Sequence, residues 1–111
     1  MPAAYTNLYI EQGTSFSTSI TLDDVYGDAY NLVGYTANSQ IRKSYYSANA
    51  TATFSASTSA TEGIIYLSLS SATTANMAAG RYVYDAKITD SGNNVTRVLE
   101  GIVEVSPSVT R

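Results

Sequence analysis

The sequence contains no cysteine, no histidine and no tryptophan, and only two prolines among its 111 residues. Without cysteine, the chain can form neither a disulfide framework nor a thiolate nucleophile. Without histidine, it lacks the usual general base at neutral pH, so no Ser-His or Cys-His catalytic pair can be built. Zinc sites of ordinary composition are excluded for the same reason. These absences predict a protein that is not an enzyme and that carries no cofactor.

Charged residues are also scarce, at 14% of the chain, and they leave a net charge of −3. Proteins that bind nucleic acid cluster Lys and Arg, whereas the six basic residues here are scattered, so we expect no nucleic-acid partner. The opening residues, MPAAY, do not form a basic segment followed by an apolar run. No uninterrupted apolar run approaches the roughly 18 residues of a membrane span, so we expect neither that export route nor a membrane contact.

Tyrosine is the most over-represented residue, with ten copies against two phenylalanines. Tyrosine is enriched at protein interfaces, and its ring also stacks on sugars. Four tyrosines fall in expected loops and are interface candidates: Tyr26, Tyr30, Tyr45 and Tyr46. They could instead pack their rings on one end of the domain and keep their hydroxyls in water, and the sequence leaves both interpretations open.

Residues 79–88 carry the clearest recognisable pattern, because Tyr82, Tyr84, Ala86 and Ile88 share one face of a strand. The preceding residues 71–79 are polar, start with an N-cap candidate in Ser71, and predict one or two helical turns. A helical turn followed by Gly80-x-Tyr82-x-Tyr84 is typical of the corner of an immunoglobulin-like sandwich. We therefore expect the Tyr82 hydroxyl to bond to the backbone of residues 71–79 and Tyr84 to lie in the core.

Alternation of apolar and polar residues, broken by turn formers every 8 to 12 residues, predicts seven strands at 7–12, 14–22, 35–42, 52–57, 64–69, 79–88 and 95–105. The fold class is therefore all-β, an immunoglobulin-like antiparallel β-sandwich of about seven strands with one short helical turn. We expect residues 1–111 to form one domain with a short C-terminal extension at 106–111. Within the sandwich, we expect residues 52–57 to form an edge strand. The expected core residues are Phe16, Ile20, Leu22, Ile41, Phe54, Ile65, Leu67, Leu69, Tyr82, Tyr84, Ile88, Leu99 and Val103.

The last expected strand is apolar on both faces, which a half-buried strand should not be. Val98 and Ile102 lie on the face opposite Leu99 and Val103. One explanation is a β-bulge at Gly101 that switches the phase, and we favour it. The other is a partner that covers the second face, which makes Val98 and Ile102 interface candidates.

Acidic loop residues offer a weak metal hypothesis. Asp23, Asp24 and Asp28 share one loop and could supply oxygen ligands to Ca²⁺, but their spacing matches no EF-hand. Acids in loops usually serve turns, so we expect no metal. On the outer face of the sandwich, Asp85 is expected to pair with Arg42 as an exposed ion pair.

Five stretches of the sequence carry a resemblance when they are taken together: LYIEQGTSF at 8–16, LVGYTANSQIRK at 32–43, residues 63–69 and 79–88, and RVLEGIVEVSPSVTR at 97–111. They resemble a family of small proteins encoded among the structural genes of tailed bacteriophages, especially myovirus-like phages of marine cyanobacteria. The resemblance implies a non-enzymatic, immunoglobulin-like accessory virion protein of the head, neck, tail or baseplate, located in the virion and assembled in the host cytoplasm. Its partners would be other virion proteins or further copies of itself.

A host-surface glycan-binding module of the virion is the alternative function.

The segment 106–111 cannot continue a strand ladder past Pro107, so we expect it to act as an arm that contacts a neighbouring protein, with Val109 and Arg111 among its contact residues.

Overall fold

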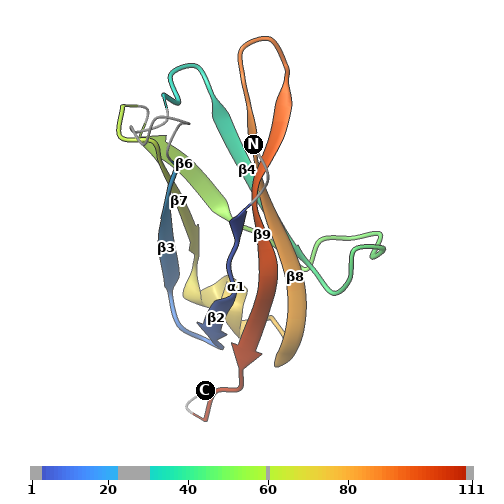
Figure 1. The fold of residues 1–111 in the computed structure, drawn as a ribbon. Helices are drawn as coiled ribbons and strands as arrows, with labels where there is room; N and C mark the ends of the chain where they lie inside the picture. Colours follow the sequence, from blue (N-terminus) through green and yellow to red (C-terminus); the bar gives the residue numbers. More distant parts are fainter. Residues whose placement is uncertain (1–3, 23–30, 60, 110–111) are drawn as a thin grey trace.

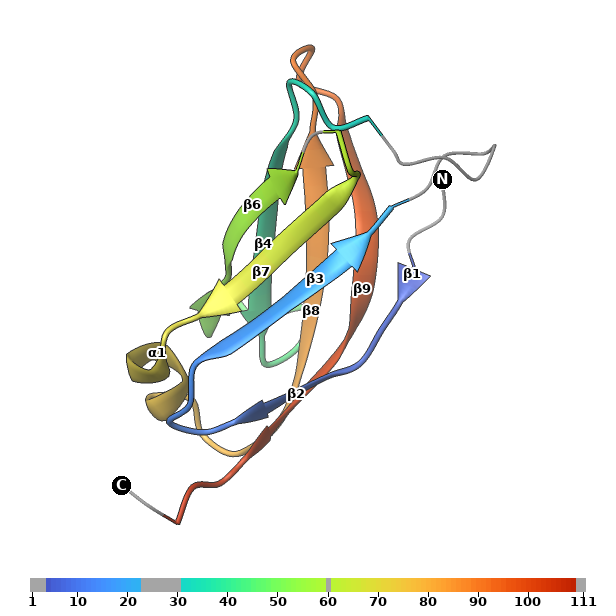
Figure 2. The same ribbon diagram turned by 90° about the vertical axis from the view of Figure 1, so that its left-hand side faces the viewer.

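The computed structural model describes residues 4–22, 31–59 and 61–109, which form two facing β-sheets (Figure 1). The larger sheet has six strands, and its order starts with the two short N-terminal strands, both of which pair with β9. The strands are β1 (Ala4–Tyr5), β2 (Leu8–Glu11), β9 (Val95–Ser106), β8 (Gly80–Thr89), β4 (Thr36–Arg42) and β5 (Ala52–Thr53). The smaller sheet has the order β3 (Phe16–Thr21), β7 (Ile64–Leu69) and β6 (Ser55–Ser59). A short helix, α1 (Ser71–Ala75), lies at one end between the sheets (Figure 2). The chain is an immunoglobulin-like β-sandwich, as the strand pattern predicts.

The expected strand at 52–57 is divided between the two sheets. β5 pairs with β4 at the edge of the large sheet, whereas β6 pairs with β7 at the edge of the small sheet. Phe54 stands at the crossing point, where its N–H donates to the carbonyl of Ser39 at 3.0 Å and its side chain is buried. The prediction of an edge strand is confirmed, and the buried ring explains why the strand changes sheet where it does.

The N-terminal strands depart from the expected antiparallel arrangement. β1 and β2 both run parallel to β9, with Leu8 opposite Val103 and Ile10 opposite Val105. Gly13, with φ of +82°, then turns the chain out of the large sheet and into β3 of the small one. This tight turn is therefore one of the connections that join the two sheets.

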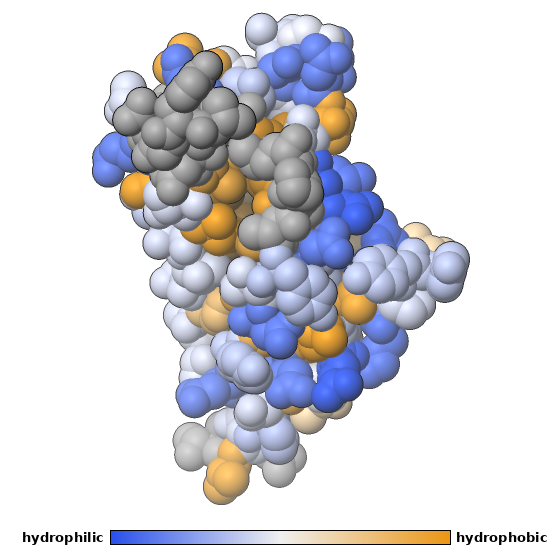
Figure 3. All heavy atoms as spheres, viewed as in Figure 1, coloured by the Kyte–Doolittle hydropathy of each residue, from blue (hydrophilic) through white to orange (hydrophobic). Residues whose placement is uncertain are grey.

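The core fills the space between the sheets. Eleven of the thirteen expected core residues are buried, while Phe16 and Ile20 are partly buried and pack against the core. Both lie on β3, an edge strand, so one side of each is left uncovered by its own sheet. Figure 3 shows hydrophobic side chains at this opening between the sheets. The core also includes residues outside that expected set: Leu8, Ile10, Leu32, Ala52, Met77, Ala86, Val98 and Val105.

β9 contains a bulge, but not at Gly101. The register with β8 shifts between Ala86, which faces Leu99, and Lys87, which faces Arg97, so Val98 is the extra residue. Val98 and Leu99 are consequently buried side by side, each 1% exposed. The bulge explains why β9 is apolar on both faces, and it removes Val98 from the interface candidates. Ile102 stays on the outer face, where it is half-buried.

The corner before β8 has the expected hydrogen bond. The Tyr82 hydroxyl donates to the carbonyl of Ala78 at 2.6 Å, and Tyr82 and Tyr84 are both buried. Gly80 adopts a φ of +141°, which side-chain-bearing residues rarely adopt. The helix N-cap is Ser70 rather than Ser71, because the Ser70 hydroxyl accepts from the Thr73 N–H at 3.2 Å.

Candidate functional site

No three His, Cys, Asp or Glu side chains of the described residues are grouped to hold a metal ion. Asp23, Asp24 and Asp28 lie outside the described residues, so the calcium hypothesis stays untested. No described helix is long and apolar enough to span a membrane. The candidate functional features are therefore the outer faces of the two sheets, which differ sharply in charge.

The outer face of the small sheet is uncharged. None of the residues in β3, β6 and β7 is Asp, Glu, Lys or Arg, and small hydroxyl side chains alternate outward along the two edge strands. Tyr66 lies in the middle of this face, 43% exposed, opposite Ser19 on one side and Ser57 on the other. Figure 3 shows pale, weakly polar surface on this side and strongly hydrophilic surface over the large sheet. We call this uncharged surface, made by β3, β6 and β7, the small-sheet face.

β3 is an unprotected edge of the small sheet. Among the described residues it pairs with β7 alone, and the pairing runs without a register shift from Phe16 to Thr21. Natural edge strands usually carry a Lys, a Pro or a bulge that discourages pairing with another chain, and β3 has none of these. Among the described strands, none pairs with its second edge, which could therefore accept a further strand.

The large sheet carries a shallow hollow of about 250 Å³ on its outer face, which we call the outer hollow. Arg42, Lys87 and Arg97, three of the six basic residues of the chain, line it. The other lining residues are Gln40, Tyr45, Val83, Tyr84 and Asp85. Basic side chains from three adjacent strands are thus brought together in a chain whose net charge is −3.

The expected pair between Asp85 and Arg42 does not form. Asp85 pairs instead with Arg97, at 3.5 Å, and Arg97 also contacts Glu100 at 3.2 Å. Arg42 donates to the Ser47 carbonyl at 2.8 Å and to Gln40 Oε1 at 2.9 Å. The register explains the difference, because it places Gln40 directly opposite Asp85 and leaves Arg42 opposite Val83.

Two of the four candidate tyrosines lie in the described part of the chain, and one of them lines the outer hollow. Tyr45 and Tyr46 belong to the loop 43–51 between β4 and β5, which projects from the large sheet (Figure 1) and which Arg42 anchors through the Ser47 carbonyl. Tyr45 lines the hollow and is 63% exposed, and Tyr46 is 97% exposed. Tyr26 and Tyr30 lie outside the described residues, so a surface of four tyrosines stays untested.

The C-terminal segment is less free than the sequence suggests. Ser106 is still part of β9, and the Ser108 N–H donates to Gln12 Oε1 at 3.1 Å. Gln12 in turn donates through Nε2 to the Met77 carbonyl at 2.8 Å, which ties the segment to the domain. The expected arm therefore begins no earlier than Val109, which is 95% exposed, and Arg111 lies outside the described residues.

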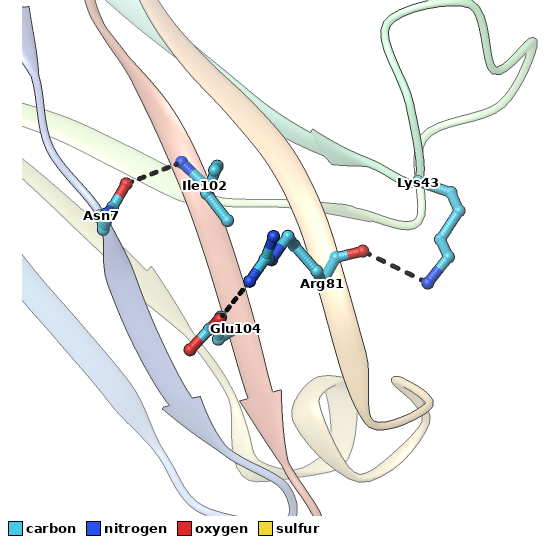
Figure 4. A network of polar contacts seen from close by, with 5 residues as sticks. All are labelled: Asn7, Lys43, Arg81, Ile102 and Glu104. Carbon is cyan, nitrogen blue, oxygen red and sulfur yellow. Dashed lines mark hydrogen bonds and ion pairs between the residues drawn. The ribbon is translucent and has the colours of Figure 1, made fainter.

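Sequence reasoning also missed a junction where the N-terminal strand is interrupted between β1 and β2. The Thr6 carbonyl accepts a hydrogen bond from the Tyr84 hydroxyl at 2.6 Å, and a Cβ placed on Gly101 would overlap that carbonyl. Asn7 Oδ1 accepts from the Ile102 N–H at 3.4 Å (Figure 4). Gly101 thus makes room for a crossing backbone, and no local pattern reveals a contact between residues 78 positions apart.

An ion pair lies on the outer face next to this junction. Arg81 contacts Glu104 at 3.2 Å, and Lys43 donates to the Arg81 carbonyl at 3.2 Å (Figure 4). The Lys43 ammonium also stands 4.7 Å from the centre of the Tyr82 ring, which is within cation–π range. Arg81 and Lys43 thus have partners at this end of the sheet, whereas the other three described basic side chains, Arg42, Lys87 and Arg97, line the outer hollow.

Comparison with known proteins supports the fold class but identifies no protein family. No family model matches the sequence, and no curated protein resembles it closely enough to count as a match. Among solved structures, CopC from Methylosinus trichosporium OB3b is similar, with a TM-score of 0.52 at 13% identity. The similarity covers 94% of this chain and 89% of that one. At this identity the similarity supports the β-sandwich fold alone.

Proposed function

We propose that this chain is a non-enzymatic structural protein of a bacteriophage particle and that it acts through protein–protein contacts. The observation that carries the proposal is the small-sheet face, with its absence of charge and its unprotected edge at β3. The resemblance of residues 8–16, 32–43 and 97–111 to phage structural proteins supplies the setting. The position within the particle is head, neck, tail or baseplate.

An uncharged surface favours protein contact for an energetic reason. Burying neutral hydroxyl groups costs less than burying charges, because an ion loses far more hydration energy. Interface cores are accordingly depleted in charged residues and enriched in tyrosine, and Tyr66 stands at the centre of this face. Contact between copies through β3, β6 and β7 would bring no like charges of these strands together.

The free edge of β3 gives this contact a geometry. A strand from a neighbour can extend a sheet through main-chain hydrogen bonds while alternate side chains provide selectivity. The uninterrupted six-residue run of β3 presents such a template. A repeated component of a particle needs a contact of this kind that forms the same way at every copy.

A charge placed on this face tests the proposal. Ser19→Lys puts an ammonium on an exposed outward position of β3, where it discourages strand addition. Thr36→Lys makes the same kind of change at an exposed position of β4 and is the control. We expect Ser19→Lys to fold normally yet to fall in abundance in purified particles, measured by quantitative mass spectrometry, while Thr36→Lys is incorporated normally. Equal incorporation of the two folded variants would remove the small-sheet face from the proposal.

The second candidate function, a host-surface glycan-binding module of the virion, is favoured by the exposed ring of Tyr45 at the outer hollow. Aromatic rings that keep one face in solvent are suited to stacking on sugars. Its test is attachment of particles to host cells with Tyr45→Ala. Lost attachment with unchanged incorporation would favour this function over the first.

A further inference from the structure

We infer that the outer hollow binds a carboxylated sugar, and this inference rests on the second candidate function rather than on the small-sheet contact. The hollow measures about 250 Å³, slightly below the roughly 300–1,000 Å³ of pockets for drug-sized ligands. Its size therefore suits one sugar ring with its substituents. The chemistry of the lining selects the class of sugar.

The hollow contains positive charge that the protein does not neutralise. Lys87 and Arg97 face each other across β8 and β9, an arrangement that destabilises a sheet when the two charges are alike. Arg97 is compensated by Asp85 and Glu100, but Lys87 has no ion-pair partner among the described residues. Arg42 bonds to an amide and a carbonyl oxygen and has no carboxylate partner within the described part of the chain. An anionic ligand in the hollow would supply the opposite charge that these two side chains lack.

A carboxylate is the anion that fits this arrangement. The guanidinium of Arg42 and the ammonium of Lys87 come from β4 and β8, on adjacent strands of one face. Charge-assisted hydrogen bonds from such groups to a carboxylate are about twice as strong as bonds between neutral groups. Asp85 reduces the local positive charge, which favours a singly charged ligand over a doubly charged phosphate.

The remaining groups favour a sugar over an acidic peptide. Sugar hydroxyls both donate and accept, and the hollow offers acceptors in Asp85 as well as donors in Lys87 and the Gln40 amide. For a peptide rich in Asp and Glu, Asp85 would be a source of repulsion. Tyr45, 63% exposed at the rim, supplies a ring on which a sugar can stack.

Binding to the purified protein tests the inference directly. Calorimetric titration with a glucuronate-containing oligosaccharide is compared with titration of the matching neutral glucose oligosaccharide and of an acidic peptide. We expect the carboxylated sugar to bind, with an affinity that falls as salt is raised, and the neutral sugar to bind at least about tenfold more weakly, the loss expected for one charge-assisted hydrogen bond. Backbone NMR shifts on titration should be confined to the strands around Gln40, Asp85 and Lys87.

Variants assign the binding to the hollow. Lys87→Gln is expected to weaken carboxylated-sugar binding about tenfold and to leave neutral-sugar binding unchanged. Arg81→Gln removes an exposed basic residue from the same sheet face outside the hollow, and it is the matched control with no expected effect. Two further outcomes overturn the inference in different ways. Equal binding of neutral and carboxylated sugars keeps the glycan function but removes the charge selectivity, whereas binding of the acidic peptide alone makes the hollow a protein site and removes both.

Discussion

Two tyrosine hydroxyls on β8 bond to segments that lie between regular elements. Tyr82 donates to Ala78, between α1 and β8, and Tyr84 donates to Thr6, between β1 and β2, each at 2.6 Å. Tyr82 lies four residues from its partner and follows a recognisable corner pattern, so the sequence predicts its bond. The partner of Tyr84 is 78 residues away, so the sequence places Tyr84 in the core but cannot predict the contact.

Loss of the Tyr82 hydroxyl should loosen the corner. Tyr82→Phe leaves the Ala78 carbonyl without its donor, and we expect the free energy of unfolding to fall by about 0.5–1.5 kcal/mol. Urea denaturation measures the change. Tyr46→Phe removes a hydroxyl from a side chain that is 97% exposed and should leave the midpoint unchanged. A midpoint for Tyr82→Phe equal to that of Tyr46→Phe would show that the corner bond contributes nothing.

Tyr84 should make stability depend on pH in the alkaline range. Its burial, with a smaller contribution from nearby Tyr5, raises its pKa from 10.0 to about 12. The folded protein therefore keeps a proton that the unfolded chain loses as the pH passes 10. The stability due to neutral Tyr84 is complete below pH 10 and is lost as the pH rises through 12.

Thermal unfolding between pH 9 and pH 12 should show this loss as a falling midpoint. Tyr84→Phe has no titrating group at this position, so its midpoint should start lower and fall less steeply. Parallel curves for the two proteins would mean that other tyrosines cause the whole of the alkaline loss.

Gly101 should tolerate no side chain. Its Cβ would overlap the Thr6 carbonyl and press on the ring of Tyr84. Because both neighbours are fixed by their mutual hydrogen bond, we expect Gly101→Ala to lower the free energy of unfolding by about 1–3 kcal/mol or more. Gly92→Ala, in the exposed turn between β8 and β9, meets only ordinary contacts and serves as the control. Equal denaturation curves for the two variants would contradict the proposed role of Gly101.

At the scale of elements, strands with strict alternation were predictable and strands shaped by distant contacts were not. β7 coincides with the expected strand 64–69, since its inward Ile65, Leu67 and Leu69 leave one possible phase. The expected strand 52–57 changes sheet at Phe54, which is a tertiary effect. The parallel pairing of β1 and β2 with β9 likewise depends on residues almost a hundred positions apart.

The C-terminal segment separates into an anchored part and an exposed part. Deleting residues 109–111 leaves β9 and the bond from Ser108 to Gln12 in place, so we expect no change in the denaturation midpoint. Deleting residues 106–111 also removes the Ser106 carbonyl, which accepts from the Gln12 N–H at 2.9 Å, and should lower stability by about 1–3 kcal/mol. If the longer deletion is as stable as the full chain, the Gln12 contacts do not hold this segment.

At the scale of the whole molecule, charge is divided between the two faces of the sandwich. The sequence shows that charge is scarce, but only the sheet order shows that β3, β6 and β7 have none while Arg42, Lys87 and Arg97 meet on the other sheet. Tyr45 and Tyr46 were identifiable from loop position, whereas Tyr66 was hidden in a strand pattern. The candidate sites were therefore the least predictable part of the structure, because they depend on which strands become neighbours.

The most direct test of protein contact through the small-sheet face is amide hydrogen exchange of the same protein, free and assembled in purified phage particles. A strand added at the free edge would protect backbone amides of β3, Phe16–Thr21, that exchange with solvent in the free protein. We expect slower exchange in this segment on assembly, with little change along loop 43–51. Two results would contradict protein contact through the small-sheet face. One is absence of the protein from particles, and the other is unchanged exchange in β3 together with new protection at 43–51.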